Sequence, residues 1–227
     1  IKNKEVLLPS LSFVTTAHAI LYNGGIPKFV DVDPHTLCID TINLEKSISK
    51  KTKMILPVHF AGYPSNLDSI SKLCKKFNLI SVEDAAHAAG TTYKNQKIGS
   101  HSNAVCFSFH PVKNLAMPGG GIISLNKKNI SKNEKLLKSK RWCGITNRKS
   151  TNYDVEYLGW NFYMNEFSAS IGNEQLKKLD KMNAYRKNIA KKYNSEIATE
   201  NKIPFSKDCS YHIYWILVKN RKFLIKK

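Results

Sequence analysis

One lysine of this chain lies between two segments that have the pattern of buried strands. Residues 105–110 alternate apolar and polar side chains, and Pro111 ends that alternation. Three consecutive glycines at 119–121 allow a tight turn before a second apolar segment at 122–124. We therefore expect Lys113 in a loop between two strands. Because burial disfavours the ammonium form, a lysine placed there can hold the free amine that Schiff-base chemistry requires.

A solvated surface charge is the alternative for Lys113, because the chain has 36 lysine and arginine residues. A second segment, residues 79–90, favours the chemical role. It has the pattern of a short buried strand that ends in Glu83 and Asp84, followed by small residues and His87. Ligands of open α/β sheets bind beyond the carboxyl ends of the strands, where these side chains would lie.

A carboxylate at this edge can hold a positive charge on a heterocyclic nitrogen, and an imidazole can contact the same ring. The alternative role for the two acids is to cap a helix and to compensate its dipole. A lysine for the aldehyde and an aspartate for the pyridinium nitrogen are the minimal pair for pyridoxal 5′-phosphate (PLP). Lys113 and Asp84 are therefore the candidate catalytic pair.

The elements that must position this pair follow from the periodicity of the chain up to residue 124. Asp40 and Asn66 are candidate N-caps for two of the helices. The predicted strands are 6–8, 28–32, 54–58, 79–84, 105–110 and 122–124, and the predicted helices are 14–23, 41–48 and 67–77. Alternating strands and helices indicate the α/β class, with a mostly parallel sheet and helices on both faces.

The second half of the chain has a different character. We expect a lysine-rich helix over 129–142, interpreted as a solvated face, and an irregular segment over 151–164. A long helix over 165–198, broken or eased near Gly172, carries an apolar stripe that is expected to face the core. Residues 211–218 are predicted to form a strand. The expected domains are a large domain over 1–165 and, over 166–227, a connecting helix with part of a small domain.

Composition restricts the partners. The net charge of +19 would suit an anionic partner, but the basic residues are scattered, which favours a solvated surface. The sequence has no zinc-finger spacing, phosphate-binding loop or dinucleotide-binding motif, so neither nucleic acid nor a metal ion is expected. The five cysteines form no CxxC pair and indicate a reduced, cytoplasmic protein. No apolar run is long enough for a membrane span.

Five short motifs resemble those of the DegT/DnrJ/EryC1/StrS family of PLP-dependent sugar aminotransferases, and they stand in that family's order. They are Pro-Ser-Leu-Ser-Phe at 9–13, Phe-Val-Asp-Val-Asp-Pro at 29–34, Pro-Val-His at 57–59, Glu-Asp-Ala-Ala-His at 83–87 and Ser-Phe-His-Pro-Val-Lys-Asn at 108–114. The resemblance covers nearly the whole chain. It implies the fold-type I large domain, PLP as the cofactor, and a homodimer with shared active sites.

The resemblance also implies a role for each matching residue. Lys113 binds the cofactor aldehyde and then moves a proton as general base and acid, while Asp84 keeps the pyridine nitrogen protonated. His87 contacts the ring or its 3-hydroxyl, and Ser108 reaches the phosphate. Phe13 stacks on the ring, with core packing as its alternative role.

Three further positions complete the expected site. Asn161 reaches the cofactor phosphate of the neighbouring subunit. His59 and His110 are candidates for the substrate side, although a hydrogen-bonded structural histidine is the alternative for His59.

Several features depart from the family's pattern. Tyr163 stands where the family's Gly-x-Asn-x-Arg-Met signature has arginine, which puts any role of that arginine in doubt here. Residues 116–121, Ala-Met-Pro-Gly-Gly-Gly, keep the backbone room of the family's Thr-Thr-Gly-Glu-Gly-Gly but lose its hydroxyl and acid. The chain starts at Ile1 without an initiator methionine, so we expect a fragment. Such a fragment would lack the N-terminal phosphate-binding segment and the later part of the small domain.

The implied reaction is transfer of an amino group, with glutamate as the donor, to a nucleotide-linked keto-sugar for amino-sugar and polysaccharide biosynthesis. Two alternatives stay open. One is a truncated or non-catalytic paralogue that acts through dimerisation. The other is a related PLP-dependent sugar dehydratase, against which Lys113 counts, because that subgroup has histidine in place of the lysine.

Overall fold

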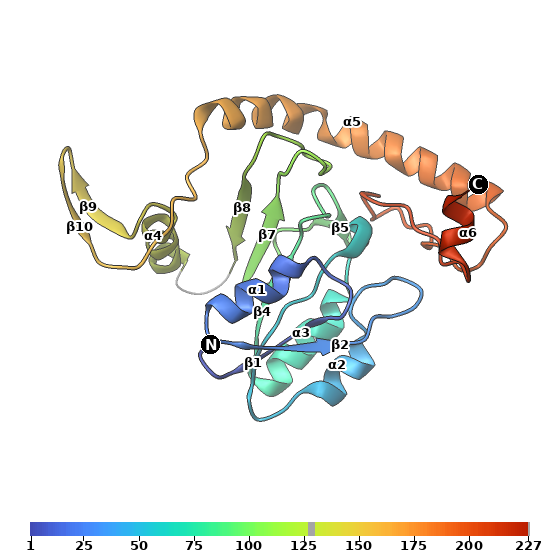
Figure 1. Cartoon of the computed structure of the whole chain (residues 1–227), viewed down its shortest axis with the longest axis horizontal. Coiled ribbons are helices and arrows are strands. Elements are labelled where there is room, and N and C mark those ends of the chain that lie inside the picture. The colour runs from blue at the N-terminus through green and yellow to red at the C-terminus, as the bar shows by residue number, and fades with distance from the viewer. Residues whose placement is uncertain (127–129, 227) are drawn as a thin grey trace.

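The central feature of the molecule is a six-stranded sheet with the order β2-β1-β3-β4-β7-β8 (Figure 1). The structure, a computed structural model, describes residues 1–126 and 130–226. Five strands run parallel, and β8 pairs antiparallel with β7. The strands are β1 (Glu5–Pro9), β2 (Ile26–Val30), β3 (Thr52–Ile55), β4 (Ile80–Asp84), β7 (Ala104–Ser108) and β8 (Gly121–Leu125). The predicted α/β class with a mostly parallel sheet is therefore confirmed.

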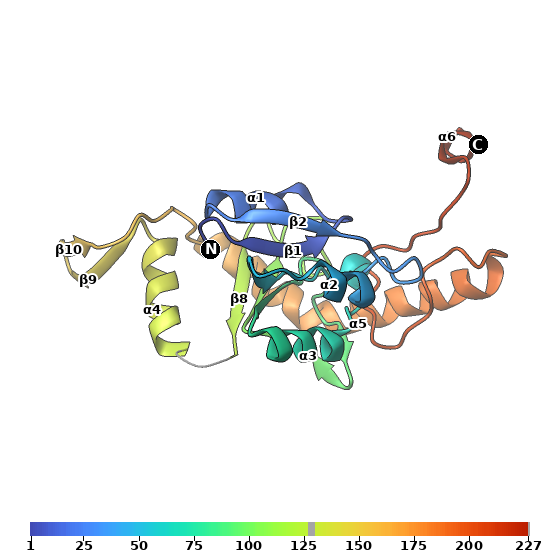
Figure 2. The same ribbon diagram turned by 90° about the horizontal axis from the view of Figure 1, so that it is seen from below.

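Helices cover both faces of this sheet. Helix α1 (Val14–Tyr22) lies on one face, and α2 (Thr41–Ser47) and α3 (Leu67–Phe77) lie on the other (Figure 2). Because neighbouring residues of a strand point to opposite faces, β1 contributes to both cores. Val6 and Leu8 pack in a cluster with α1, while Leu7 packs in the larger cluster with α2 and α3.

The predicted N-caps hold two of these helices. The Asp40 carboxylate accepts hydrogen bonds from the backbone N–H groups of Ile42 and Asn43, and the Asn66 side chain accepts one from Ser69. These caps satisfy backbone donors that the first helical turn leaves free. Helix α3 ends at Asn78, whose φ of 51° is the left-handed conformation that terminates many helices.

The segment between β7 and β8 is a closed loop, residues 109–120. The Phe109 N–H donates to the Gly120 carbonyl at 2.9 Å, and the Met117 N–H donates to the Phe109 carbonyl at 3.0 Å. Gly120 has a φ of +134°, a conformation that side chains disfavour. The predicted glycine turn thus returns the chain to β8 and leaves Lys113 in the loop.

Beyond β8 the chain forms a projection, here called the arm (residues 130–164), which extends past the edge of the sheet (Figure 1). It starts with α4 (Ile130–Arg141), and Asn129 of the predicted helix lies outside the described residues. The predicted irregular segment is wrong in part, because β10 (Asn152–Val155) pairs antiparallel with β9 (Ile145–Lys149). A polar, exposed hairpin has little of the apolar alternation that identifies a strand.

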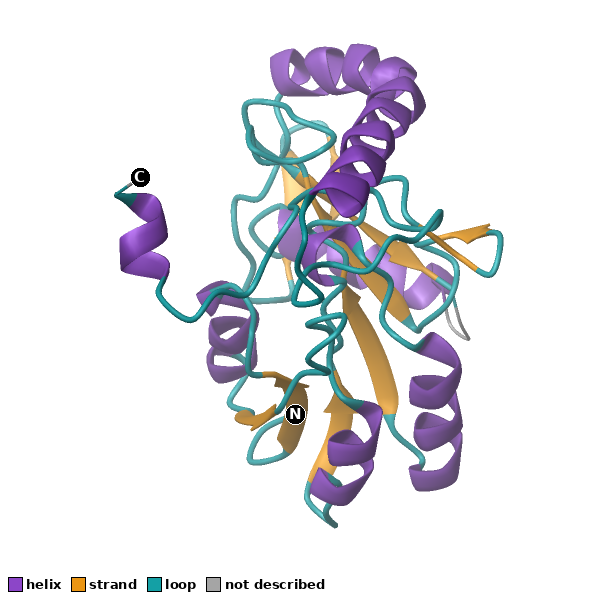
Figure 3. Cartoon of the chain, turned by 90° about the vertical axis from the view of Figure 1, so that its right-hand side faces the viewer, coloured by secondary structure: helices purple, strands orange, loops and turns teal. Residues whose placement is uncertain are grey.

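Helix α5 (Glu166–Glu196) runs unbroken across the carboxyl end of the sheet (Figure 3). Of the break or easing predicted near Gly172, the break does not occur; a Cβ at this position would lie 2.6 Å from the Met117 sulfur, so the glycine serves close packing. The predicted apolar stripe does not face the core as a whole, since Leu176 and Tyr185 are exposed. The buried face includes polar and small residues because it covers loops rather than a sheet: Ser168, Gly172, Leu179, Asn183 and Ala190.

The chain after α5 returns along this helix without forming a strand. The predicted strand 211–218 is wrong, and Ile216 makes only an isolated bridge to Lys202. Tyr211 and Trp215 are instead buried against Ala190, so their apolar surface anchors a loop. The remaining elements are short: η1 (Phe60–Gly62), β5 (Thr92–Tyr93), β6 (Gln96–Lys97) and α6 (Arg221–Ile225). Among the described residues, no helix has the length and apolar character to cross a membrane.

Candidate active site

Asp84 is the last residue of β4, at the carboxyl edge of the sheet between β3 and β7. Its carboxylate accepts a hydrogen bond from the Thr16 hydroxyl at 2.8 Å and one from the Ala86 N–H at 3.0 Å. Its backbone pairs with Pro57 and His59 of the neighbouring segment. Both carboxylate oxygens are therefore bound, and the side chain has a fixed direction.

Lys113 lies half-buried in the loop between β7 and β8. Burial lowers the pKa of the Lys113 amine below its usual range, while attraction to the Asp84 carboxylate acts in the opposite direction. Strand β7, which leads into the Lys113 loop, pairs with β4, which ends at Asp84, so the two residues come from neighbouring strands at one edge of the sheet. A lowered amine pKa increases the fraction of free base near neutral pH.

His87 follows Asp84 by three residues and lies half-buried beside the same edge. Its ring centroid is 4.4 Å from that of His212 and 5.9 Å from that of Phe60. Burial lowers the pKa of His87 to about 4, and the positive charge of Lys113 adds to this effect. The imidazole is therefore neutral near pH 7 and can contact a flat aromatic group.

Phe13, Ser108 and His110 lie on the two segments that lead to the residues of the pair or to their partners, the start of α1 and the end of β7. Phe13 precedes α1, with its side chain 71% exposed, and its carbonyl accepts the Thr16 N–H that starts the helix. Ser108 ends β7, and its hydroxyl accepts the His110 N–H at 3.4 Å. The exposed His110 in turn accepts the Lys113 N–H on its backbone carbonyl. These three side chains stay candidates for contacts with a cofactor or substrate.

The structure corrects the expected role of His59. The side chain is fully buried, and its Nε2 donates to the Glu83 carboxylate at 2.8 Å while its Nδ1 accepts the Ser65 N–H at 3.1 Å. The other Glu83 oxygen accepts the Ser102 N–H at 2.9 Å. Since no face of the ring is open, His59 cannot reach a substrate, and its alternative role as a structural histidine holds.

Asn161 lies on the arm, apart from this edge. It is exposed and forms a backbone bridge with Trp142 at the end of α4. Among the described residues, no hydrogen bond joins Asn161 to Lys113 or Asp84. The structure therefore does not bring Asn161 together with the other candidates in one chain.

Comparison with known proteins identifies the family. Residues 1–227 match the profile of the DegT/DnrJ/EryC1/StrS aminotransferase family. The chain belongs to this family.

Three similar proteins agree with this assignment. SpsC of Bacillus subtilis, a spore coat polysaccharide biosynthesis protein, is 34% identical over an alignment of 228 positions, which covers 96% of this chain and 59% of SpsC. The structure of PseC from Helicobacter pylori, an aminotransferase of pseudoaminic acid biosynthesis, matches 99% of this chain and 61% of its own with a TM-score of 0.89 and 31% identity. A PLP-form structure of Spr1654 from Streptococcus pneumoniae matches 94% of this chain and 60% of its own, with a TM-score of 0.84 and 29% identity. The chain thus spans about three fifths of these relatives.

A positively charged side chain lies beside Tyr163, the residue at the arginine position of the signature that the sequence resembles. The Arg141 guanidinium lies over the Tyr163 ring at 5.4 Å from its centroid, and the ring packs edge-on against Trp142 at 5.3 Å. Both contacts lie within the arm. The tyrosine therefore serves the packing of the arm in this family member.

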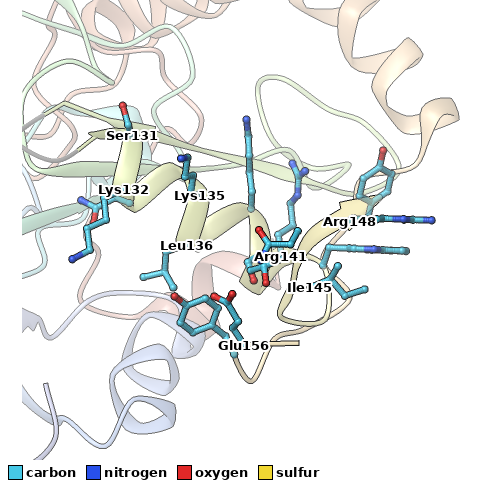
Figure 4. Close-up of a pocket in the computed structure, with 16 residues that line it drawn as sticks. Ser131, Lys132, Lys135, Leu136, Arg141, Ile145, Arg148 and Glu156 are labelled. Atoms are coloured by element: carbon cyan, nitrogen blue, oxygen red, sulfur yellow. The ribbon is translucent and has the colours of Figure 1, made fainter. Parts of the chain in front are cut away.

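Two hollows of the surface are lined in part by the arm. One of about 1180 Å³ lies between α4 and the β9–β10 hairpin, with Lys132, Lys135, Arg141 and Arg148 in its lining (Figure 4). Another of about 1100 Å³ lies between β7, β8, α4 and the start of α5, and Gly119 and Gly120 of the Lys113 loop are among its lining residues. Neither of these two hollows has Lys113 or Asp84 in its lining, but the second borders the Lys113 loop and Cys106, which pairs with Asp84 in the sheet.

Sequence reasoning missed four polar residues that support the site: Thr16, Asn114, Asn183 and His212. Thr16 orients the Asp84 carboxylate, and the other three form a hydrogen-bonded group beside Lys113. Their contacts bridge 68 to 98 positions of the chain. Only the adjacency of Asn114 to Lys113 could have drawn attention to one of them.

Proposed function

We propose that this chain is part of a PLP-dependent aminotransferase that transfers an amino group from glutamate to a nucleotide-linked keto-sugar. The observation that carries the proposal is that Asp84 ends β4 while the Lys113 loop follows β7, the strand paired with β4, at one edge of the sheet. The relatives add support, since one acts in pseudoaminic acid biosynthesis and another in spore coat polysaccharide biosynthesis. We assign the product to amino-sugar and polysaccharide biosynthesis on that basis.

The residues present fit PLP. The donor set consists of an amine with a lowered pKa, a carboxylate held by two hydrogen bonds, a neutral imidazole and an exposed phenyl ring. Lys113 would hold the cofactor covalently, Asp84 would pair with its ring nitrogen, and Phe13 and His87 would contact the ring. Ser108 would bind the phosphate. When bound, PLP withdraws electrons from the bonds of the amine-bearing carbon, which side chains alone cannot do.

The chain's own groups supply the proton transfers. The Lys113 Nζ, as free base, would take the proton from the α-carbon of the amino donor and return it to the carbon on the other side of the amine nitrogen. The Asp84 carboxylate would keep a proton on the ring nitrogen of the bound cofactor by its negative charge. Thr16 and Ala86 hold this carboxylate in one orientation, so its charge acts at a fixed place.

We propose further that the enzyme is a homodimer in which the arm completes the partner's site. The Trp160 and Phe162 rings stack at 5.7 Å yet remain 56% and 69% exposed. Large exposed aromatic groups in one place are typical of an interface. A second copy would cover them and bring Asn161 to the phosphate in the partner's site.

The remaining expectations are consistent with this proposal. The five cysteines are free in the structure, which suits a reducing cytoplasm. The described residues contain no group of His, Cys, Asp and Glu side chains suited to a metal ion. The intact pair of Lys113 and Asp84 favours an active enzyme over a non-catalytic paralogue, and the presence of the lysine counts against a sugar dehydratase.

Borohydride reduction tests the assignment of Lys113. In the purified protein incubated with PLP, we expect reduction to fix the cofactor on the peptide that contains Lys113, as identified by mass spectrometry. Lys113→Ala should abolish this labelling and the associated visible absorbance. Lys50→Ala, an exposed lysine before β3, is the matched control and should label like the wild type. Labelling of a different lysine in Lys113→Ala would contradict the proposal.

A further inference from the structure

We propose that His212 is a positioning residue for Lys113, which it holds through a hydrogen bond to the neighbouring Asn114. The inference rests on the proposed function of Lys113. His212 lies in the segment after α5, almost a hundred residues from the loop that carries the lysine. It therefore joins the C-terminal part of the chain to the candidate active site.

Asn114 is the centre of this connection. It directly follows Lys113 and is 3% exposed. Its amide nitrogen donates to the Asn183 side-chain oxygen at 2.9 Å and to the Ser210 carbonyl at 3.0 Å. Its amide oxygen lies 3.0 Å from the His212 Nδ1. Three elements thus converge on one buried side chain: the Lys113 loop, α5 and the C-terminal segment.

These contacts fix the tautomer of His212. Because the Asn114 amide nitrogen already faces two oxygen acceptors, its oxygen is the atom that meets the ring, and the His212 Nδ1 must donate. Burial lowers the pKa of His212 to about 3, and the charges of His87, Lys113 and Arg186 add to this effect. The ring is therefore neutral near pH 7, with its proton on Nδ1.

The segment that carries His212 is itself held in place. The His212 N–H donates to the Ala61 carbonyl at 2.8 Å, and the Ser210 hydroxyl donates to the His87 carbonyl at 3.1 Å. Gly62 packs against this segment so closely that a Cβ would lie 2.3 Å from the Ser210 hydroxyl oxygen. The His212 ring, which donates the hydrogen bond to Asn114, is therefore held rigidly and can restrain the Lys113 loop.

The restraint matters because a lysine side chain has many rotamers. The bonds to Asn114 fix the backbone next to Lys113, so that the amine returns to the same half-buried place near Asp84. Without the His212 bond, the loop would gain freedom and the amine would gain solvent. The pKa of Lys113 would then rise toward its ordinary value, because burial is the main cause of its lowering.

Two substitutions separate the hydrogen bond from the space that the ring fills. His212→Phe keeps a ring of similar size but removes the Nδ1 donor, whereas His212→Asn loses the ring but can place its amide nitrogen near the former Nδ1. We measure the acetylation rate of Lys113 against pH in the protein without PLP, by mass spectrometry of its peptide. We also measure kcat and KM of the loaded enzyme.

In His212→Phe we expect the midpoint of Lys113 acetylation to move to higher pH and kcat to fall about 10- to 100-fold, with a smaller change in KM. In His212→Asn, the acetylation midpoint and kcat should both return most of the way to their wild-type values. If His212→Phe does not fold, Asn114→Ala removes the other half of the same bond and carries the same expectation.

An unchanged acetylation midpoint in a folded His212→Phe variant would overturn the proposal. So would an equal loss in His212→Phe and His212→Asn, which would indicate that only the filled space matters. Acetylation does not require the cofactor, so this result is independent of the borohydride experiment. If borohydride labels another lysine while the acetylation midpoint still moves, the proposed function fails and the positioning of Lys113 by His212 stands.

Discussion

The carboxyl edge of the sheet and the arm are built by opposite means. At the edge, distant parts of the chain hold the pair: Thr16 binds the Asp84 carboxylate, and Asn183 and His212 bind Asn114, the residue next to Lys113. On the arm, the main contacts are local: β9 pairs with β10, and Tyr163 packs against Trp142. The edge is thus fixed by the fold of one chain, whereas the arm exposes its aromatic side chains.

This difference divides the proposed site into two parts. The groups that would do the chemistry, Lys113 and Asp84, are positioned without help from a second copy. The group proposed to hold the phosphate, Asn161, lies on a surface that one chain leaves uncovered. A substitution at the edge should therefore damage the subunit that carries it, and a substitution on the arm should damage the partner.

The largest effect is expected from Asp84→Asn, which removes the negative charge at the edge. An amide cannot keep the ring nitrogen protonated, so turnover should fall about 10³-fold while borohydride labelling of Lys113 persists. Steady-state turnover at saturating PLP measures this. Asp31→Asn, an exposed acid after β2, is the control and should keep wild-type turnover. Wild-type turnover in Asp84→Asn would exclude the proposed role of the carboxylate.

The sequence predicted the edge well because its elements follow simple periodicities. Asp40 and Asn66 cap their helices as expected, and the strand before Asp84 ends at the expected residue. The alternation of strands and helices was enough to place Asp84 and the loop of Lys113 at the carboxyl end of the sheet. Local pattern and tertiary position agree there because each buried strand has an apolar run of its own.

The sequence predicted residues 211–218 and the buried face of α5 poorly, because contacts between distant segments decide their structure. Residues 211–218 have the composition of a strand, but Tyr211 and Trp215 are buried against α5 and no neighbouring strand is available. The prediction for the apolar stripe of α5 failed for a related reason. Asn183, a polar residue outside the stripe, faces the Lys113 loop, whereas Leu176 and Tyr185 of the stripe are exposed. The hydrogen bonds of Thr16 and His212 leave no periodic signal at all.

The next effect is expected from Glu83→Gln, which tests the buried support behind the edge. Burial raises the pKa of Glu83, but the hydrogen bond and charge of His59 and the Ser102 N–H outweigh it, so the net pKa is lowered. A glutamine side chain can accept a hydrogen bond from only one of the two donors, His59 and the Ser102 N–H. Its own amide N–H group would then face the other donor. We expect the free energy of unfolding at pH 7 to fall by about 2 kcal/mol, as measured by denaturant titration.

The pH dependence gives this prediction a sign. A lowered folded-state pKa stabilises the protein above the ordinary glutamate value, and this contribution disappears as pH falls through the lowered value. The destabilisation by Glu83→Gln should therefore shrink in acid. Glu134→Gln, the same change on the exposed arm, should leave the unfolding midpoint unchanged. Equal effects of the two substitutions would contradict the contrast between edge and arm.

The smallest effect is expected from Asn161→Ala on the arm, and it is the effect that can show which subunit Asn161 serves. Loss of one hydrogen bond to the phosphate should weaken PLP binding about tenfold, as measured by absorbance titration. Co-expression with Lys113→Ala then produces hybrid dimers, in which one site carries both defects and the other carries neither. Random pairing makes about a quarter of all sites intact, so a tight-binding fraction of that size should reappear. If Asn161 served its own subunit, every site in the mixture would keep one defect and no tight fraction would form.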